Sequence, residues 1–218
     1  MSSAADSRQA LLDAAEQLYA AHGIEGVSMR DIATAAGQRN NSAVQYHFGS
    51  REGLLLAIFQ DRMRSINQVR RAYLDDVERA GRGSDVRALV EAEIRPLTEF
   101  LAEIPDGSYY ARFLARVSPS AISTLAELSE VQDAGRDIVE MLVDALTHLP
   151  RRVALTRIDL MFNMMISALA LVEQRSAEGL PQLTSFADTV DHLIDMAVGA
   201  LLADRTGAPW QAQSHPEP

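Results

Sequence analysis

Apolar residues recur at helical spacing along nearly the whole chain. In the segment 7–22, Leu11, Leu12, Ala15 and Leu18 fall on one face of a helix, and a longer stripe of the same kind runs from residue 54 to residue 77. No segment shows the strict alternation of apolar and polar residues that is typical of a β-strand. The pattern therefore predicts an all-α fold.

Gly, Pro and polar runs divide this pattern into helices and turns. Helices are expected at residues 7–22, 29–36, 41–47, 51–80, 85–103, 108–118, 119–148, 151–175 and 184–204. We expect a kink or a break at Pro96, because proline removes one backbone hydrogen bond from a helix. Residues 206–218 are rich in Pro and polar residues, and are expected to form a disordered tail.

The stretch 28–52 has the form of a helix-turn-helix. Ser28 can cap a short helix, with Asp31 three residues later completing a capping box. Gly37 can end that helix in a left-handed turn, which glycine adopts at little cost. The second helix opens with amide, Ser and Arg side chains, as in helices that enter a DNA groove.

The side chains of this stretch suit DNA recognition. Asn and Gln can pair with adenine and Arg with guanine, while hydroxyl groups and helix N-termini hold phosphates. No acidic residue lies between Asp31 and Glu52, although the chain has 30 acidic residues. An ordinary polar surface helix would give a similar pattern, so composition alone leaves both interpretations open.

The overall charge argues against uniform affinity for DNA. The chain of 218 residues has a formal net charge of −10, and repulsion from phosphates opposes binding. DNA binding therefore requires a locally positive surface, for which Arg30, Arg39 and Arg51 are available. Cysteine is absent, which excludes disulfides and thiolate metal sites.

The first fifty residues resemble the DNA-binding domain of the TetR family of bacterial regulators. The resemblance rests on the segment Ala10-Leu-Leu-Asp-Ala-Ala, on Gly23, on the segment Ser28-Met-Arg-Asp-Ile-Ala, on Ala36-Gly37, and on the segment Tyr46-His-Phe-Gly-Ser-Arg-Glu-Gly-Leu. Nine residues separate Ala36-Gly37 from His47-Phe48 where the family usually has eight, and Gln45 stands where it often has Tyr. The resemblance implies a three-helix DNA-binding domain at residues 1–50 and a helical ligand-binding and dimerisation domain at residues 51–205.

This resemblance makes double-stranded DNA the expected partner, with the helix Asn41–His47 of each subunit in a major groove. Candidate base contacts are Arg39, Asn40, Asn41 and Gln45. Candidate phosphate contacts are Ser28, Arg30, Ser42, Tyr46, His47 and Arg51.

The last two helices predict a homodimer, because both carry wide apolar faces. The expected interface residues are Leu160, Met164, Val190, Leu193, Ile194, Ala197, Val198 and Leu201. The alternative is a core packed wholly within one chain.

The resemblance also implies a pocket for a small-molecule effector among the C-terminal helices. Its candidate lining residues are Phe100, Tyr109, Tyr110, Arg112, Phe113, Arg116, Met141, Phe162, Met165 and Leu169. Plain core packing is the alternative for the apolar residues, and surface ion pairs are the alternative for the two arginines.

The sequence gives little sign of an enzyme. It has no glycine-rich phosphate loop, no nucleophile elbow and no convincing group of metal ligands at helical spacing. We therefore expect no catalytic residues, no metal and no cofactor. The N-terminus does not resemble a signal peptide, and the apolar run 160–172 is too short for a bilayer, so a cytoplasmic protein without a membrane partner is expected. The function predicted is a ligand-responsive, DNA-binding transcriptional regulator, most simply a repressor that a small apolar or amphipathic effector releases from a palindromic operator. A helical carrier or enzyme with an inert N-terminal domain, and a DNA binder without a ligand, are the alternatives.

Overall fold

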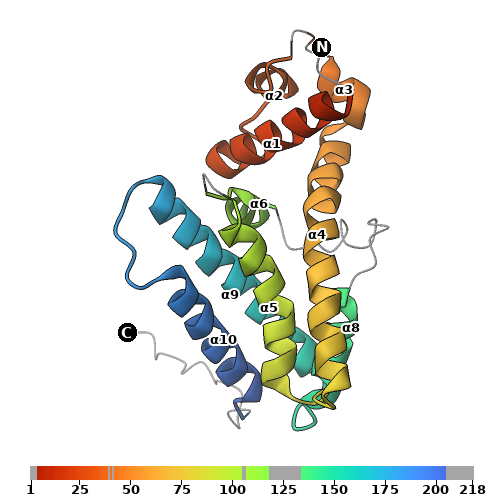
Figure 1. The fold of residues 1–218 in the computed structure, drawn as a ribbon, viewed down its shortest axis with the longest axis vertical. Helices are drawn as coiled ribbons and strands as arrows, with labels where there is room; N and C mark the ends of the chain where they lie inside the picture. Colours follow the sequence, from red (N-terminus) through yellow and green to blue (C-terminus); the bar gives the residue numbers. More distant parts are fainter. Residues whose placement is uncertain (1–3, 39, 41, 105–106, 118–133, 205–218) are drawn as a thin grey trace, which may run out of the picture.

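The computed structural model describes residues 4–38, 40, 42–104, 107–117 and 134–204, and every described element is a helix. A small N-terminal group of helices sits at one end of a longer helical body (Figure 1). The helices are α1 (Ala4–His22), α2 (Met29–Ala35), α3 (Ala43–Phe48), α4 (Arg51–Arg79), α5 (Val86–Ala102), α6 (Tyr110–Arg116), α8 (Ala134–Ala145), α9 (Arg151–Ala177) and α10 (Phe186–Leu202). The all-α prediction is confirmed for the described part of the chain.

The turn between α2 and α3 forms as its sequence predicts. Ser28 and Asp31 make a reciprocal capping box, in which the Asp31 N–H donates to Ser28 Oγ at 3.2 Å and the Ser28 N–H donates to Asp31 Oδ2 at 3.0 Å. Gly37 has φ +67°, and its N–H and that of Gln38 return to carbonyls of the last turn of α2. Local chemistry alone therefore determines where α2 begins and ends.

Helix α3 begins two residues later than the sequence pattern predicted. The carbonyl of Asn40 accepts the N–H of Ala43, and its side-chain Oδ1 accepts the N–H of Ser42 at 2.9 Å. This side chain therefore shapes a turn before the helix, a use that Asn commonly has.

Helix α4 is the long connection between the N-terminal helices and the body (Figure 1). Its N-cap is Ser50, whose Oγ accepts the N–H of Gly53 at 3.1 Å. Nothing interrupts it for 29 residues, so movement at one end can be transmitted to the other.

Helix α5 continues through Pro96 to Ala102, so of the two expected alternatives, a kink or a break, the break does not occur. Pro96 is buried in the body of the protein, where packing offsets the missing backbone hydrogen bond.

Two apolar clusters build the core. One joins α1, α2, α3 and the start of α4 to α6 and to the adjoining parts of α5, α9 and α10. The other joins the distal parts of α4 and α5 to α8, α10 and the start of α9. The N-terminal helices therefore share a continuous apolar core with α6.

Candidate DNA-binding surface and effector cavity

Helix α3 presents a polar and aromatic surface to solvent. Gln45 is exposed, and Tyr46 is 84% exposed with its ring edge-on to the ring of His47, at 5.1 Å between centroids. Ala43 and Val44 face the core and hold the helix in place. The Tyr46 side chain is therefore free to contact another molecule.

Two of the expected phosphate contacts are engaged within the protein. Ser28 caps α2, as described above, and Arg51 donates to the carbonyls of Ile24 at 2.8 Å and Val27 at 3.1 Å. Arg51 also forms an ion pair with Glu25 at 3.2 Å. These bonds fix the loop between α1 and α2 against α4, so the structure gives Arg51 a positioning role.

The other expected DNA contacts fall into two groups. Asn40 and Ser42, just before α3, and Arg30, in the first turn of α2, are exposed. Arg39 and Asn41 lie outside the described residues.

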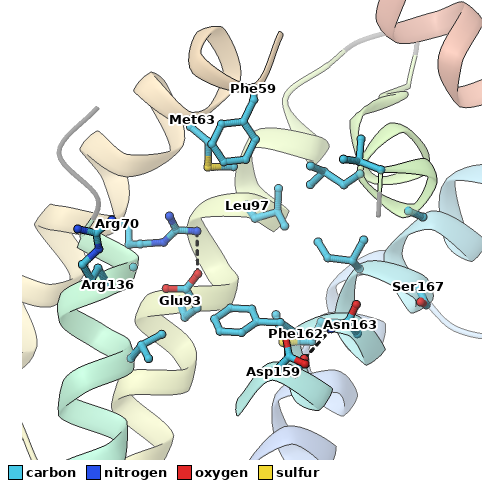
Figure 2. A pocket seen from close by; sticks show the side chains of 17 residues that line it. Phe59, Met63, Arg70, Glu93, Leu97, Arg136, Asp159, Phe162, Asn163 and Ser167 are labelled. Carbon is cyan, nitrogen blue, oxygen red and sulfur yellow. Dashed lines mark hydrogen bonds and ion pairs between the residues drawn. The ribbon is translucent and has the colours of Figure 1, made fainter. Parts of the chain in front are cut away.

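A cavity of about 430 Å³ lies in the helical body (Figure 2). It is lined from α4, α5, α6, α8 and α9, mostly by apolar side chains that include Phe59, Met63, Leu97 and Phe162. Its size and mixed lining are typical of a site for a small organic molecule. Because Phe59 and Met63 belong to α4, an occupant would touch the helix that carries the N-terminal domain.

A buried ion pair forms part of the cavity wall. Arg70 on α4 meets Glu93 on α5, with Nη2 2.9 Å from Oε1, and both side chains are only 6% exposed (Figure 2). Arg70 also donates to Asn67 Oδ1. The sequence interpretation missed this pair, although Arg70 lies on the buried stripe between Ile66 and Leu74, where a charged residue needs a partner.

Only two of the ten expected ligand-binding residues, Phe162 and Met165, line the cavity. The other apolar and aromatic candidates are core or packed against it, and they are Phe100, Tyr109, Tyr110, Phe113, Met141 and Leu169. Arg112 lies over the Tyr109 ring, and Arg116 is exposed away from the lining. The aromatic residues of α6 are therefore corrected to a packing role.

These α6 aromatics bind the N-terminal domain to the body. The rings of Tyr110 and Phe113 stack at 5.9 Å, and Phe113 stacks with Tyr19 of α1 at 6.4 Å. Leu114, Ala115 and Val117, at the other end of the same segment, line the cavity. The short helix α6 thus contacts both the cavity and α1.

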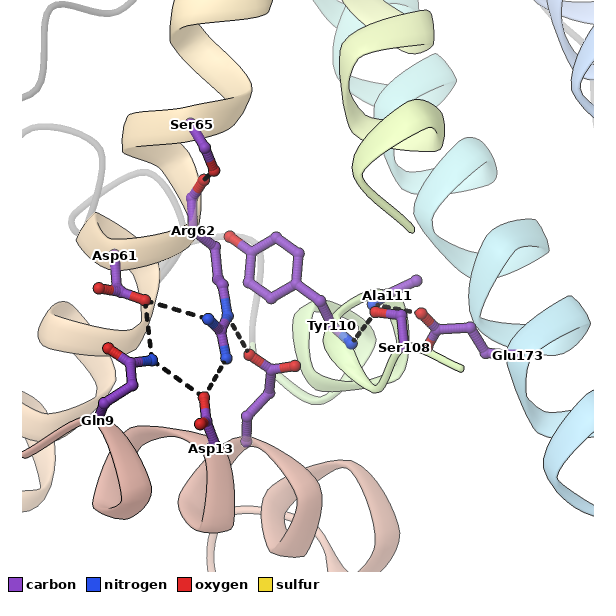
Figure 3. Close-up of polar contacts among 10 residues, drawn as sticks. Gln9, Asp13, Asp61, Arg62, Ser65, Ser108, Tyr110, Ala111 and Glu173 are labelled. Atoms are coloured by element: carbon purple, nitrogen blue, oxygen red, sulfur yellow. Dashed lines mark hydrogen bonds and ion pairs between the residues drawn. The ribbon is translucent and has the colours of Figure 1, made fainter. Parts of the chain in front are cut away.

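Polar contacts reinforce the same junction (Figure 3). Arg62 of α4 donates from Nε to Oε2 of Glu16 on α1 at 2.7 Å, and Glu16 is buried. Burial raises the pKa of the Glu16 carboxyl, although the attraction of Arg62 acts in the opposite direction. An ion pair with a buried carboxylate and a partly buried guanidinium therefore links α1 to α4.

Glu173 of α9 makes the corresponding contact with α6 (Figure 3). Its two carboxylate oxygens accept the N–H groups of Ala111 at 3.2 Å and Arg112 at 2.9 Å. Burial raises the pKa of Glu173, while these hydrogen bonds lower it. The contact ties the start of α6 to α9.

The expected dimer surface of α10 needs correction. Five of the expected residues are buried against α5 and α9 of the same chain, and they are Val190, Leu193, Ile194, Ala197 and Leu201. Met164 and Val198 are half-buried, whereas Leu160 is 61% exposed. Helical periodicity identified apolar positions correctly but could not tell which chain covers them.

A different apolar surface remains open on the last two helices. Leu160 and Leu171 on α9, and Met196 and Leu202 on α10, are each at least half exposed. We call these four residues the α9/α10 surface. They are the most exposed large apolar side chains of these two helices.

Helix α9 is, by length and composition, apolar enough to cross a membrane. Its 27 residues contain a window of mean hydropathy 1.5, of which 22% is buried within the described part of the chain. The apolar run 160–172 was expected to be too short to cross a bilayer, but the whole helix α9 is long enough. A core helix of a soluble protein meets the same criteria, and α9 also carries Arg157, which donates to carbonyl groups at the end of α10.

Comparison with known proteins agrees with this architecture. The family description "Bacterial regulatory proteins, tetR family" matches residues 11–58, and "Tetracyclin repressor-like, C-terminal domain" matches residues 91–200. The protein is thus a helix-turn-helix transcription regulator with a helical C-terminal domain. The chain belongs to the TetR family.

Individual relatives are more distant. The HTH-type transcriptional repressor AcnR of Corynebacterium efficiens is 33% identical over 110 residues, which are 46% of this chain and 57% of that repressor, so the chain spans little more than half of its length. A TetR-family regulator from Shewanella sp. PV-4 has a similar fold, with a TM-score of 0.56 and 17% identity over 89% of this chain and 97% of that one. The fatty acid degradation regulator FadR of Bacillus halodurans has a TM-score of 0.55 and 17% identity over 88% of this chain and 97% of that one. These two structures support the fold alone.

Proposed function

We propose that the protein is a homodimeric repressor that binds a palindromic DNA site through α3 and leaves it when a small molecule fills the cavity. The observation that carries this proposal is the continuity of α4. This helix begins directly after α3, and its Phe59, Met63 and Arg70 line the cavity. An effector that displaces α4 also changes the position of α3.

On the DNA side, base edges are contacted by Arg39, Asn40, Asn41 and Gln45. The DNA phosphates are contacted by Arg30, Ser42, Tyr46 and His47. Ser28 and Arg51 hold the surrounding backbone, because their side chains are already bonded within the protein. The acidic residues that give the net charge of −10 lie outside the segment from residue 32 to residue 51, so repulsion is smallest where DNA would bind.

On the partner side, the α9/α10 surface pairs with its copy in a second chain. One short recognition helix covers few bases, whereas two helices about 34 Å apart, or a multiple of that distance, read a palindrome. Burial of Leu160, Leu171, Met196 and Leu202 would also remove the largest exposed apolar side chains of these helices from water. The effector then needs a coupling of only ~1–3 kcal/mol to shift the dimer away from DNA.

Repression is proposed from the relatives, because the similar AcnR proteins are described as repressors. Family membership favours a regulator over the two other interpretations of the sequence. A carrier or enzyme with an inert N-terminal domain leaves the match of residues 11–58 to bacterial regulatory proteins unexplained. A DNA binder without a ligand leaves the cavity unexplained.

The test is a selection of bound duplexes from a random pool by the full chain, followed by binding titrations at several salt concentrations. We expect a palindrome whose affinity falls as salt rises. Gln45→Ala should relax base preference at one position of each half-site, whereas Arg30→Ala should weaken binding evenly across sequences and lower the salt slope by about one. Failure to retain any duplex in dilute buffer would contradict the proposal and favour the carrier.

A further inference from the structure

The polar groups of the cavity are separated by charge. Arg70, Glu93 and Arg136 gather on one side of the cavity, whereas Asp159 and Asn163 lie across it, beyond the ring of Phe162 (Figure 2). Apolar side chains line the space between the two groups. The first group, which we call the arginine end, has one more positive than negative charge.

At the arginine end, one guanidinium is already neutralised. Arg70 and Glu93 pair at 2.9 Å and are almost fully buried, so together they contribute no net charge. Arg136 makes no hydrogen bond or ion pair with any residue in the described ranges, and it is exposed at the edge of the cavity. The excess positive charge therefore belongs to Arg136, and an anionic group placed there would gain a charge-assisted hydrogen bond.

The opposite side favours no second anion. Asp159 is exposed, and its neighbour Asn163 donates to the Asp159 backbone carbonyl at 2.9 Å. Water already solvates this carboxylate, so it requires no cation from a ligand, but it repels a negative group. A ligand that spans the cavity should therefore carry its charge at one end only.

Arg136 is also linked mechanically to the helix that carries the DNA-binding domain. The next residue, Asp137, accepts a hydrogen bond from Arg71 of α4. A ligand held by Arg136 thus acts on α8 at the point where α8 is ion-paired to α4. Binding at the arginine end can shift α4 without a contact in the N-terminal domain.

From this charge arrangement we infer that the effector is an apolar molecule with a single anionic head, a monocarboxylate in its simplest form. The head binds Arg136 beside the Arg70–Glu93 pair, and the apolar body lies along Leu97 and Phe162. This inference rests on the proposed function for the role of the ligand, but the ligand class itself is measured without DNA.

The experiment compares three probes with the same alkyl chain, namely decanoate, decanol and decyltrimethylammonium, each below its micellar concentration. Isothermal titration calorimetry with the full chain measures their affinities. We expect decanoate to bind most tightly. Arg136→Gln should weaken decanoate by about two- to fivefold, the range for an ion pair at an exposed side chain. The matched control is Arg152→Gln, an exposed arginine on α9 outside the cavity lining, which should leave decanoate binding unchanged.

Charge reversal gives a second readout that a general loss of folding cannot imitate. Arg136→Glu should bind decyltrimethylammonium more tightly than decanoate. The inference is overturned if decanoate fails to bind, if decanol or the ammonium binds the unmodified chain as tightly, or if Arg136→Gln leaves decanoate unaffected. If decyltrimethylammonium, and not decanoate, releases the selected DNA, the ligand class is refuted and the proposed function stands. If the chain binds decanoate but no DNA, the proposed function is refuted.

Discussion

Replacement of Arg62 by Met tests the charge network that joins the N-terminal domain to α4 (Figure 3). The Arg62 guanidinium contacts Glu16 at 2.7 Å, Asp13 at 2.7 Å and Asp61 at 3.1 Å. Met keeps most of the apolar stem of Arg62 and removes only its charge and its donors. The variant therefore isolates the electrostatic contribution.

The three acidic partners differ in burial, and this difference sets the expected cost. Asp13 is 56% exposed, so its pair should contribute at most about 1 kcal/mol. The side chain of Glu16 is 5% exposed, and a buried carboxylate that loses its cation destabilises a protein by about 3–5 kcal/mol. We expect Arg62→Met to lower the free energy of unfolding by about 3 kcal/mol at neutral pH, since partial protonation of Glu16 relieves some of the cost.

The assay is urea denaturation followed by circular dichroism at one fixed protein concentration, because the apparent stability of a dimer depends on concentration. The double variant Arg62→Met/Glu16→Gln is the control. It buries no charge at this site, so it should recover to within about 1 kcal/mol of the parent. The single variant Glu16→Gln should cost about 1 kcal/mol, because Arg62 keeps its two aspartate partners.

The pH dependence has a definite sign. Burial raises the pKa of Glu16 in the folded protein above its ordinary value of 4.5. The protonated carboxyl therefore adds to the free energy of unfolding below pH 4.5, and this stabilisation is lost as the pH rises through the pKa of the folded state. Loss of Arg62 raises that pKa further, so the stability gap between parent and Arg62→Met should narrow as the pH falls from neutral towards 4.5. The reasoning would be refuted if Arg62→Met had a free energy of unfolding within 1 kcal/mol of the parent at neutral pH. It would also be refuted if the loss in Arg62→Met/Glu16→Gln equalled the sum of the losses in the two single variants.

Three further perturbations test other parts of the structure. An added Cβ at Gly53 would lie 2.1 Å from the Phe48 carbonyl oxygen. Gly53→Ala should therefore lower the free energy of unfolding by about 1–3 kcal/mol in a denaturation experiment. Helix propensity alone predicts a gain in stability, and such a gain would contradict this packing. Leu160→Arg should convert the proposed dimer to a monomer, as measured by light scattering after size-exclusion chromatography, whereas an unchanged mass would exclude this part of α9 from the interface. Tyr46→Ala should weaken DNA binding about evenly across sequences with little change in melting temperature, because the side chain is 84% exposed; unchanged affinity would remove Tyr46 from the DNA surface.

Local features of the fold could be predicted from the sequence because they depend on neighbours in the chain. The capping box of Ser28 and Asp31, the left-handed turn at Gly37 and the start of α4 after Ser50 all formed as expected. The start of α3 was wrong by two residues, because the side chain and carbonyl of Asn40 form a turn that competes with a helix.

Long-range features could not be predicted in the same way. Periodicity shows that Ile194 and Phe113 are buried but does not show what covers them, and both lie within the chain's own core. The cavity needs five helices from distant parts of the sequence, so only two of its residues were anticipated. The Arg70–Glu93 pair could in principle have been predicted, because Arg70 is the one charged residue on the buried stripe of α4.

The central claim is that α3 itself contacts DNA in the sequence-specific complex. The most direct measurement places a photoreactive phenylalanine analogue at position 46 and irradiates the protein with its selected duplex. The account predicts covalent adducts that map to two sites about 34 Å apart or a multiple of that distance, one in each half-site, and no adduct from a control with the analogue at Leu183, an exposed residue between α9 and α10. Retention of the duplex without any adduct at position 46, or with equal adducts at position 183, would contradict it.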